Sequence, residues 1–216
     1  IDVYDNAMFI IALDYLLEMA PDSPQASRWK SLREGIERNV RAHLWDVKRQ
    51  KFIPHIYPEK SPIPEGFDEL AIHYHGGTAI AIEAGLLSKD EIRTVNAQML
   101  ENVRLSGMPS IGLTLYPVYP DGFFHGGMSK AYLYQNGGDW TWFGGRMIQQ
   151  LVVNGMVEEA YAEIHPMIER VIQNDGFYEW YGKGGVPSGS GNFKGSAGVL
   201  SKAIELLRDW AEKNKS

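Results

Sequence analysis

Two different hydrophobic patterns follow each other at the start of this chain. From Asp5 to Ala20 the sequence is apolar on nearly every side of a helix, which is typical of a helix buried all round. The next helical stretch carries a single apolar stripe among charged residues. That stripe consists of Trp29, Leu32, Ile36, Val40 and Leu44. We therefore predict an inner helix followed by an outer helix.

The alternation of inner and outer helices recurs along the chain. Further inner helices are predicted at residues 68–84, 139–154 and 196–213, with outer helices between them. One outer helix opens with a capping box, Ser88-Lys89-Asp90-Glu91, in which two side chains satisfy free backbone amides. The pattern predicts an all-α fold of about seven helices in antiparallel hairpins.

The loops that lead from outer to inner helices are much longer than the loops that lead from inner to outer ones. They span residues 46–67, 105–138 and 174–195. They are rich in Tyr, Trp, His, Gly and Pro rather than in charge, and long ordered loops are usually functional. Because each loop precedes an inner helix, we expect all three to meet at one end of a helical toroid. Short β-hairpins are predicted within them, at residues 51–57 and 113–119.

The composition limits the possible partners. A chain of 216 residues with 44% hydrophobic residues can bury a full core, and we expect one domain over residues 1–216. The formal net charge of −6 offers no electrostatic footprint for nucleic acid, so no such partner is expected. No stretch approaches the roughly 18 apolar residues of a membrane span, so no membrane partner is expected either. The absence of cysteine leaves the compartment open.

Two segments rich in glycine and aromatic residues carry the candidate chemistry. Residues 134–145 read Tyr-Gln-Asn-Gly-Gly-Asp-Trp-Thr-Trp-Phe-Gly-Gly. Residues 176–181 read Gly-Phe-Tyr-Glu-Trp-Tyr and continue into a glycine-rich stretch. Aromatic rings stack on the flat faces of sugars, and glycine lets the backbone approach a ligand closely. This combination indicates a sugar site, so an oligosaccharide or glycoside is the expected substrate.

A carboxylate stands in the middle of the second segment, where Glu179 lies between Tyr178 and Trp180. Glycoside hydrolysis needs a protonated carboxyl group on the leaving oxygen and a carboxylate on the opposite face of the sugar, about 6.5 to 9.5 Å apart in inverting enzymes. Two loops on the rim of a toroid can supply such a pair. The alternative for Glu179 is a surface carboxylate paired with a neighbouring cation.

Repeated helical hairpins with long loops at one end resemble the (α/α)6 barrel of six-hairpin glycosidases. Residues 176–181, together with the glycine-rich stretch and Ser196-Ala197 that follow, are similar to a segment of glycoside hydrolase family 63. Residues 134–140 are similar to a segment of the same family and of the amylo-1,6-glucosidases. The resemblance implies the C-terminal portion of an incomplete barrel and a glucosidase-like, inverting hydrolase.

The same resemblance implies roles for two carboxylates. Glu179 matches the general base of the family. Asp5, in the sequence Tyr4-Asp5-Asn6, is the nearest counterpart of its general acid. The region around Asp5 also resembles an Asp-Leu-Asn segment one hairpin after that acid, in which case the acid lies upstream of Ile1.

Several side chains near the two motifs are candidate sugar contacts. Trp140, Trp180 and Tyr181 flank glycines and are expected to stack on sugar rings, and Trp142 is either a further contact or part of the core. Asp139 is either a helix cap or first-turn acid, or a ligand for sugar hydroxyl groups. His75 is expected to line the same cleft.

Other functions remain open at this stage. Glu69 and His73 are spaced to share a metal on one helix face, but no third ligand has a recognised spacing, so neither a metal nor another cofactor is expected. A sugar epimerase or isomerase of the (α/α)6 type would use His75 and His125 as acid and base. A carbohydrate-binding remnant and a helical-repeat interaction protein are further alternatives. An incomplete toroid leaves an inner helix uncovered, so we expect self-association or a missing N-terminal half there.

Overall fold

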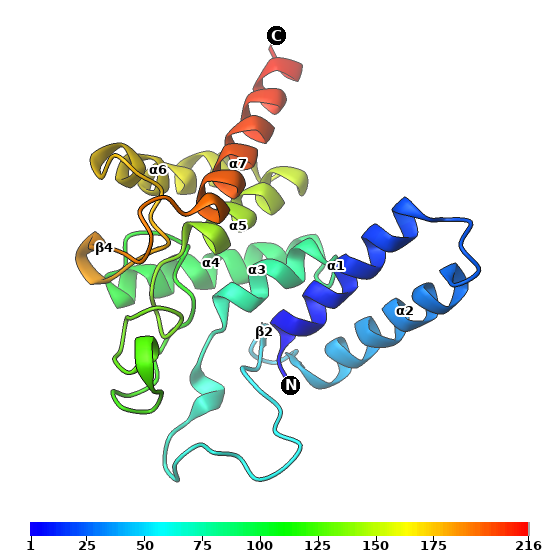
Figure 1. The fold of residues 1–216 in the computed structure, drawn as a ribbon, viewed down its shortest axis with the longest axis horizontal. Helices are drawn as coiled ribbons and strands as arrows, with labels where there is room; N and C mark the ends of the chain where they lie inside the picture. Colours follow the sequence, from blue (N-terminus) through cyan, green and yellow to red (C-terminus); the bar gives the residue numbers. More distant parts are fainter. Residues whose placement is uncertain (216) are drawn as a thin grey trace.

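Seven helices form an incomplete all-α toroid in residues 1 to 215, the part of the chain that this computed structural model describes (Figure 1). They are α1 (Val3–Met19), α2 (Ala26–His43), α3 (His75–Glu83), α4 (Lys89–Ser106), α5 (Thr141–Val153), α6 (Val157–Gln173) and α7 (Lys194–Lys213). The inner helices α1, α3, α5 and α7 each pack against the next along the ring, and α2, α4 and α6 pack against α1, α3 and α5. The predicted alternation is therefore confirmed.

The burial of each helix follows from its sequence pattern. The inner helix α3 buries every residue from His75 to Ile82, because neighbours cover all its sides. Its glycines permit this close packing, since a Cβ at Gly77 would lie 2.8 Å from the ring of Tyr74. In contrast, the outer helix α2 buries only Val40. The outer helix α4 starts at the capping box, where the Glu91 amide donates to Ser88 Oγ at 3.3 Å.

The inner helix predicted at residues 68–84 begins later than expected. Its first part folds as the short 3-10 helix η1 (Glu69–Ala71), and α3 begins only at His75. Between them, the amide of His73 donates to the carbonyl of Tyr116 at 2.7 Å, so this stretch pairs with another loop instead of continuing a helix. Glu69 and His73 therefore do not share a helix face, and the premise of a shared metal was wrong.

The strands are short and lie within the loops. β1 (Trp45–Asp46) pairs with β2 (Lys51–Phe52), and β3 (Trp180–Tyr181) pairs with β4 (Pro187–Ser188), both antiparallel. The hairpin predicted at residues 113–119 is replaced by isolated bridges, in which Leu113 pairs with Asp139 and Tyr116 with His73. Two further 3-10 turns, η2 (Gly126–Met128) and η3 (Lys183–Gly185), lie in the loops before α5 and α7. The long loops gather on one side of the helices, where the N-terminus of α1 also lies (Figure 1).

One face of α1 is open. Ile10 and Leu13 are buried, but Phe9, Tyr15 and Met19 are 48%, 56% and 73% exposed. The expectation that this helix is buried all round was therefore wrong, because α2 and α3 cover only part of it. Its uncovered face agrees with the expectation that an incomplete toroid leaves an inner helix open.

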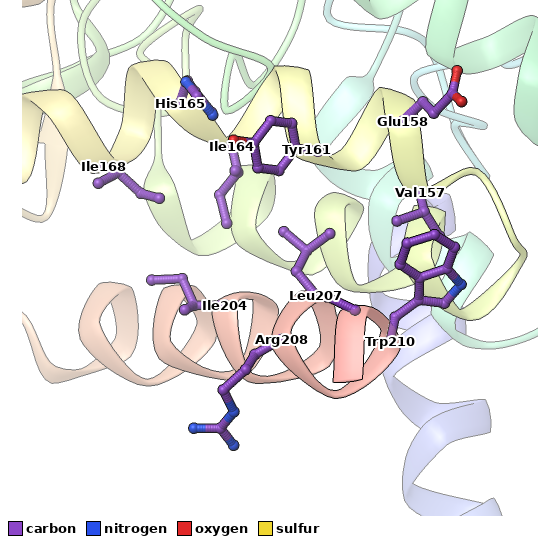
Figure 2. Close-up of a pocket in the computed structure, with 11 residues that line it drawn as sticks. Val157, Glu158, Tyr161, Ile164, His165, Ile168, Ile204, Leu207, Arg208 and Trp210 are labelled. Atoms are coloured by element: carbon purple, nitrogen blue, oxygen red, sulfur yellow. The ribbon is translucent and has the colours of Figure 1, made fainter. Parts of the chain in front are cut away.

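A second open edge lies at the other end of the ring, between α6 and α7. An apolar groove of about 690 Å³ runs between these helices, and Figure 2 shows Ile164 from α6 and Leu207 from α7 pointing into it. Tyr161 and Trp210 border it with 62% and 45% of their surfaces exposed. In residues 1 to 215, no helix is both long enough and apolar enough to cross a membrane.

Candidate functional site

A pocket of about 210 Å³ lies where the loops before α5 and α7 meet the start of α1 and α5. The loop before α3 contributes no residue to its lining. It is lined by Tyr4, Tyr134, Gln135, Trp140, Trp142, Phe143, Glu179 and Phe193. Glu179 is the one carboxylate among these lining residues, and the others are aromatic apart from Gln135. The pocket thus brings together the two sequence motifs and the beginning of the chain.

The aromatic walls hold each other in fixed orientations. The rings of Tyr134 and Trp140 meet edge to face, with centroids 4.9 Å apart, and Trp140 Nε1 donates to the Tyr134 carbonyl at 3.1 Å. Tyr4 from α1 lies 6.4 Å from the ring of Trp142. The guanidinium of Arg146 lies 4.4 Å from the centroid of the Trp142 ring. Trp140 is only 5% exposed, whereas Tyr4, Tyr134 and Trp142 are half-buried. Partly exposed aromatic rings suit stacking against a flat apolar ligand surface such as a sugar ring.

Glu179 is half-buried and is presented by the hairpin that β3 and β4 form. Its amide donates to the carbonyl of Ser190 at 2.9 Å, and the Ser190 amide lies 3.4 Å from Glu179 Oε2. Gly189 has a φ of +71°, and a Cβ there would lie 2.4 Å from the same oxygen. Only glycine lets the hairpin pass this close to the carboxylate. The backbone of Glu179 is held by the hairpin, and its carboxylate makes one long contact, to a backbone amide.

Asp139 lies beneath the pocket and does not line it. Its side chain is fully buried, 2.8 Å from Arg170 Nη1, and accepts from Ser110 Oγ at 2.9 and 2.7 Å. Its backbone amide and carbonyl pair with Tyr181 at 2.9 and 2.8 Å. The cap or first-turn expectation was wrong, because Trp140 occupies the N-cap of α5. This buried carboxylate, beside Arg170 and Ser110, lies where the backbone of Asp139 pairs with the loop that carries Glu179, and it does not line the pocket.

Three other expected sugar contacts also lie outside the lining of the pocket. Tyr181 is fully buried, with the Arg170 guanidinium 4.0 Å from the centroid of its ring. Trp180 is half-buried and packs edge to face on Tyr134 without lining the Glu179 pocket. His75 is 4% exposed, and its Nε2 lies 2.9 Å from Asn102 Nδ2. Burial lowers the pKa of His75 to about 3. Of the expected contacts, Trp140 and Trp142 therefore meet Glu179 in one pocket.

Asp5 lies beside the pocket without lining it. It is an exposed residue in the first turn of α1, and its amide donates to the capping side chain of Asp2 at 3.0 Å. Its neighbour Tyr4 lines the pocket. Burial raises the pKa of the Tyr4 hydroxyl, and the nearby charge of Asp5 raises it further. Asp5 is thus close to the aromatic wall, and the pocket itself contains a single carboxylate.

Sequence reasoning missed five residues of the pocket: Tyr4, Tyr134, Gln135, Phe143 and Phe193. Tyr134 and Gln135 belong to the first motif, so a signal for them was present. Tyr4 lines the pocket because the start of α1 reaches it, and Phe193 lines it because the loop before α7 folds back toward α5. Neither position could be inferred from the motifs. Within residues 1 to 215, no group of three or more His, Cys, Asp and Glu side chains is arranged to hold a metal.

Comparisons with known proteins place this fold. No protein-family model matches the sequence, and no curated protein matches it. Among solved structures, 97% of the chain superposes on a family 63 mannosylglycerate hydrolase from Thermus thermophilus in complex with Tris and D-glycerate, with a TM-score of 0.65 and 19% identity. The same enzyme with glucose gives a TM-score of 0.66 and 18% identity, as does an uncharacterized conserved protein from the same organism.

The chain spans less than half the length of these solved proteins, since it covers 45%, 46% and 48% of them. Identities below 20% establish a shared architecture and do not transfer an activity. The resemblance to six-hairpin glycosidases is therefore confirmed at the level of the fold, and this chain has the helical architecture of part of a family 63 glycoside hydrolase.

Proposed function

We propose that this protein takes part in the inverting hydrolysis of a glycosidic bond, with Glu179 as the general base. The observation that carries the proposal is a single carboxylate in a pocket whose other walls are aromatic side chains and one amide. The fold of a glycoside hydrolase, seen in the solved neighbours, supports it. Glucosides and mannosides are the first candidate substrates, because the neighbouring enzyme is named for a mannoside and was solved with glucose.

In the proposed reaction the sugar ring stacks on Trp142, which is half-buried, whereas Trp140 is 5% exposed and supports the wall from below. A water molecule lies between Glu179 and the anomeric carbon. Glu179 removes a proton from this water while its oxygen attacks the carbon, and the bond to the leaving oxygen breaks on the opposite face. A second carboxyl group must protonate that oxygen. Asp5 is the candidate in this chain, and a carboxyl group on a further helical hairpin is the alternative.

Replacing Glu179 by Gln tests the base. The amide keeps the shape of the side chain but cannot accept the proton of water, so turnover should fall by about 100- to 10,000-fold. Sugar binding should persist. Glu212→Gln, an exposed position on α7, is the matched control and should leave turnover unchanged. Near-normal hydrolysis by Glu179→Gln, or a complete loss of sugar binding, would remove Glu179 from the role of base.

Product analysis on α- and β-glucosides and mannosides separates the remaining functions. Release of a sugar with inverted anomeric configuration, followed by NMR, supports the proposal. Binding without turnover by the wild type would favour a carbohydrate-binding role. Isomerisation without cleavage would favour the epimerase alternative, for which the pocket around Glu179 offers no histidine among its lining residues.

We also propose that both open edges of the toroid pack against further helical hairpins. The solved neighbours are about twice as long as this chain, and both edges expose apolar side chains on a helix where a ring would continue. Tyr15 and Met19 mark one edge, and Tyr161 and Trp210 mark the other. Exposed apolar patches of this kind usually mark contact sites.

Sedimentation velocity over a wide concentration range tests the open edges. The chain by itself should associate through them, and the double variant Met19→Lys and Trp210→Lys should associate less. A compact monomer at high concentration, unchanged by the double variant, would contradict the proposal. A defined dimer that the variant leaves intact would show that association uses another face.

A further inference from the structure

The same arrangement of an arginine, a tryptophan and a glutamate occurs twice in this fold. In each case the arginine and the tryptophan are four positions apart, the guanidinium covers the indole ring, and a glutamate of another helix pairs with the arginine. The first arrangement consists of Arg41, Trp45 and Glu91, and the second consists of Arg146, Trp142 and Glu83. The two arrangements differ in what surrounds the tryptophan.

The first arrangement has a covered tryptophan. The guanidinium of Arg41 lies 4.7 Å from the centroid of the Trp45 ring, and Arg41 Nη2 donates to Glu91 Oε1 at 2.6 Å. Trp45 is 5% exposed and packs edge to face on Phe52, with ring centroids 4.9 Å apart. These contacts tie α2 and β1 to α4, so this arrangement acts in the folding of the chain.

The second arrangement lies beside the Glu179 pocket. Trp142 is half-buried and lines that pocket, and Arg146 follows one turn later on α5 with its guanidinium 4.4 Å from the centroid of the Trp142 ring. Arg146 does not line the pocket. The ring face that Arg146 covers therefore points away from the pocket, and the opposite face is the one left for a ligand.

Glu83 keeps Arg146 in this place. It is the last residue of α3, and its Oε2 accepts from Arg146 Nη1. A negative charge at the C-terminal end of a helix is unfavourable, whereas a cation there is stabilised by the helix dipole. The side chains of Arg146 and Glu83 are only 20% and 19% exposed, which reduces the screening of their attraction by water. The guanidinium is thus held over the indole, where the ring electrons also attract it.

The edges of Trp142 are packed as well. The ring of Phe143 stands nearly perpendicular to it, with centroids 5.0 Å apart. A Cβ at Gly195, in the first turn of α7, would lie 3.1 Å from Trp142 Cδ1. A ring that is covered on one face and packed at its edges is already ordered before a ligand arrives. Stacking on such a ring costs less conformational entropy than stacking on a mobile one.

We propose that Arg146, anchored by Glu83, is a positioning residue for sugar binding: it covers one face of Trp142 and holds the ring so that the opposite face stacks on the sugar. The inference rests on the proposed sugar site at the Glu179 pocket. It assigns a share of the sugar affinity to an ion pair between α3 and α5 that does not line that pocket.

Titration calorimetry with methyl α- and β-glucosides and mannosides on the full chain tests this role. Arg146→Met keeps the length of the side chain but removes its charge, so the affinity should fall by about three- to tenfold. Arg146→Lys keeps a cation and should lose less. In turnover of the bound sugar, KM should rise in Arg146→Met while kcat stays within about twofold, because the base is unchanged. Arg41→Met removes the same contacts from the first arrangement and is the matched control, which should leave the affinity unchanged.

A double-mutant cycle shows whether the effect passes through the indole. In the Trp142→Ala background, Arg146→Met should change the affinity by less than about twofold, because no ring remains to be positioned. Glu83→Gln leaves Arg146 in the chain but removes its counter-charge, and it should weaken binding by about two- to threefold. The Glu83 variant keeps the inference testable if Arg146→Met fails to fold.

The outcomes separate this inference from the function on which it rests. Unchanged affinity in Arg146→Met, an equal loss in the Trp142→Ala background, or the same loss in Arg41→Met would overturn the positioning role even if Glu179-dependent hydrolysis is found. Sugar binding that depends on Arg146 without any turnover would support the inference and overturn the hydrolysis. Failure of the wild type to bind any of these glycosides would overturn both.

Discussion

Two carboxylates in the segments between α-helices, Glu179 and Glu69, have different surroundings. Glu179 has one backbone amide at 3.4 Å from its carboxylate. Glu69 has three side-chain partners at 2.6 to 2.8 Å on one oxygen. A carboxylate oxygen that accepts from several side chains is held in place and fixes the local shape, whereas a carboxylate with one long contact can still accept from water or a ligand. The number of donors thus distinguishes the two glutamates, and it predicts a structural role for Glu69 and leaves Glu179 as the candidate base.

Asp139 is a third carboxylate of the same region, and its side chain is fully buried. Its carboxylate contacts both Arg170 and Ser110, and its backbone pairs with Tyr181, two residues after Glu179. We therefore expect Asp139 to affect the pocket indirectly, by holding the loop that carries Glu179. Substitutions at four carboxylates, in decreasing order of consequence, test this difference.

Chemical rescue is the most demanding test of Glu179. Glu179→Ala should lower turnover by about 100- to 10,000-fold, because no base remains to activate water. Azide needs no general base, so added azide should restore part of the reaction and yield a glycosyl azide, detected by mass spectrometry. Glu69→Ala should show no such rescue. Recovery by azide in the Glu69 variant alone would exchange the roles of the two residues.

Breaking the buried pair should mainly affect folding. Asp139→Asn leaves Arg170 without its buried counter-charge, which should lower the free energy of unfolding by about 3 to 5 kcal/mol. Urea denaturation measures this loss, and the double variant Asp139→Asn with Arg170→Gln should lose less than the sum of the single variants. If Asp139→Asn kept its stability but lost sugar binding, Asp139 would be a sugar ligand as the sequence suggested.

Replacing Glu69 should have a smaller effect on stability. Glu69→Gln keeps one accepting oxygen but loses the charge that three partners share, so the free energy of unfolding should fall by about 1 to 3 kcal/mol. Turnover of methyl glycosides should fall far less than in Glu179→Gln. A loss of turnover as large as that of Glu179→Gln at unchanged stability would contradict a structural role for Glu69.

A fourth carboxylate, that of Glu163, should make the stability of the fold depend on pH. Glu163 of α6 is 8% exposed, accepts from Asn96 Nδ2 of α4 at 2.7 Å, and burial raises its pKa from 4.5 to about 7. The folded state therefore holds this proton more tightly than the unfolded state, and stability should fall as the pH rises from about 4.5 to 7. The loss is at most about 3 kcal/mol.

Melting temperatures at pH 5 and pH 8 measure this effect. Glu163→Gln should reduce the difference between them, because an amide does not titrate. Glu169→Gln, on the same helix, is the matched control. An unchanged pH dependence in Glu163→Gln would show that other groups cause it.

Much of the helical architecture could be predicted from the sequence. The inner helices at residues 139–154 and 196–213 lie within a few residues of α5 and α7, because their apolar faces meet other helices as the periodicity requires. The late start of α3 could not be predicted, since the extended stretch at His73 depends on a partner, Tyr116, that is distant in the sequence. Similarly, the open face of α1 follows from which helices are present around it.

The candidate site, like the fold, could be predicted from the sequence only in part. The glycine- and aromatic-rich motifs led to Trp140, Trp142 and Glu179, and these three line one pocket. The same motifs could not show that Tyr181 and Asp139 turn into the core, because alternate residues of an extended segment point to opposite sides. His75 is buried by the packing of α3 and α4, which no local pattern encodes.

The alternation of helices and the segments that carry the chemistry follow from the sequence alone, because hydrophobic periodicity and glycine content act over short distances. Which carboxylate keeps few donors depends on the folded chain. Glu69, Asp139 and Glu179 are all acidic residues in the segments between α-helices, and their partners Tyr119, Ser110 and Ser190 lie 50, 29 and 11 positions away. Those contacts arise only when the loops pack together, and they separate a residue that shapes the site from one that can act in it.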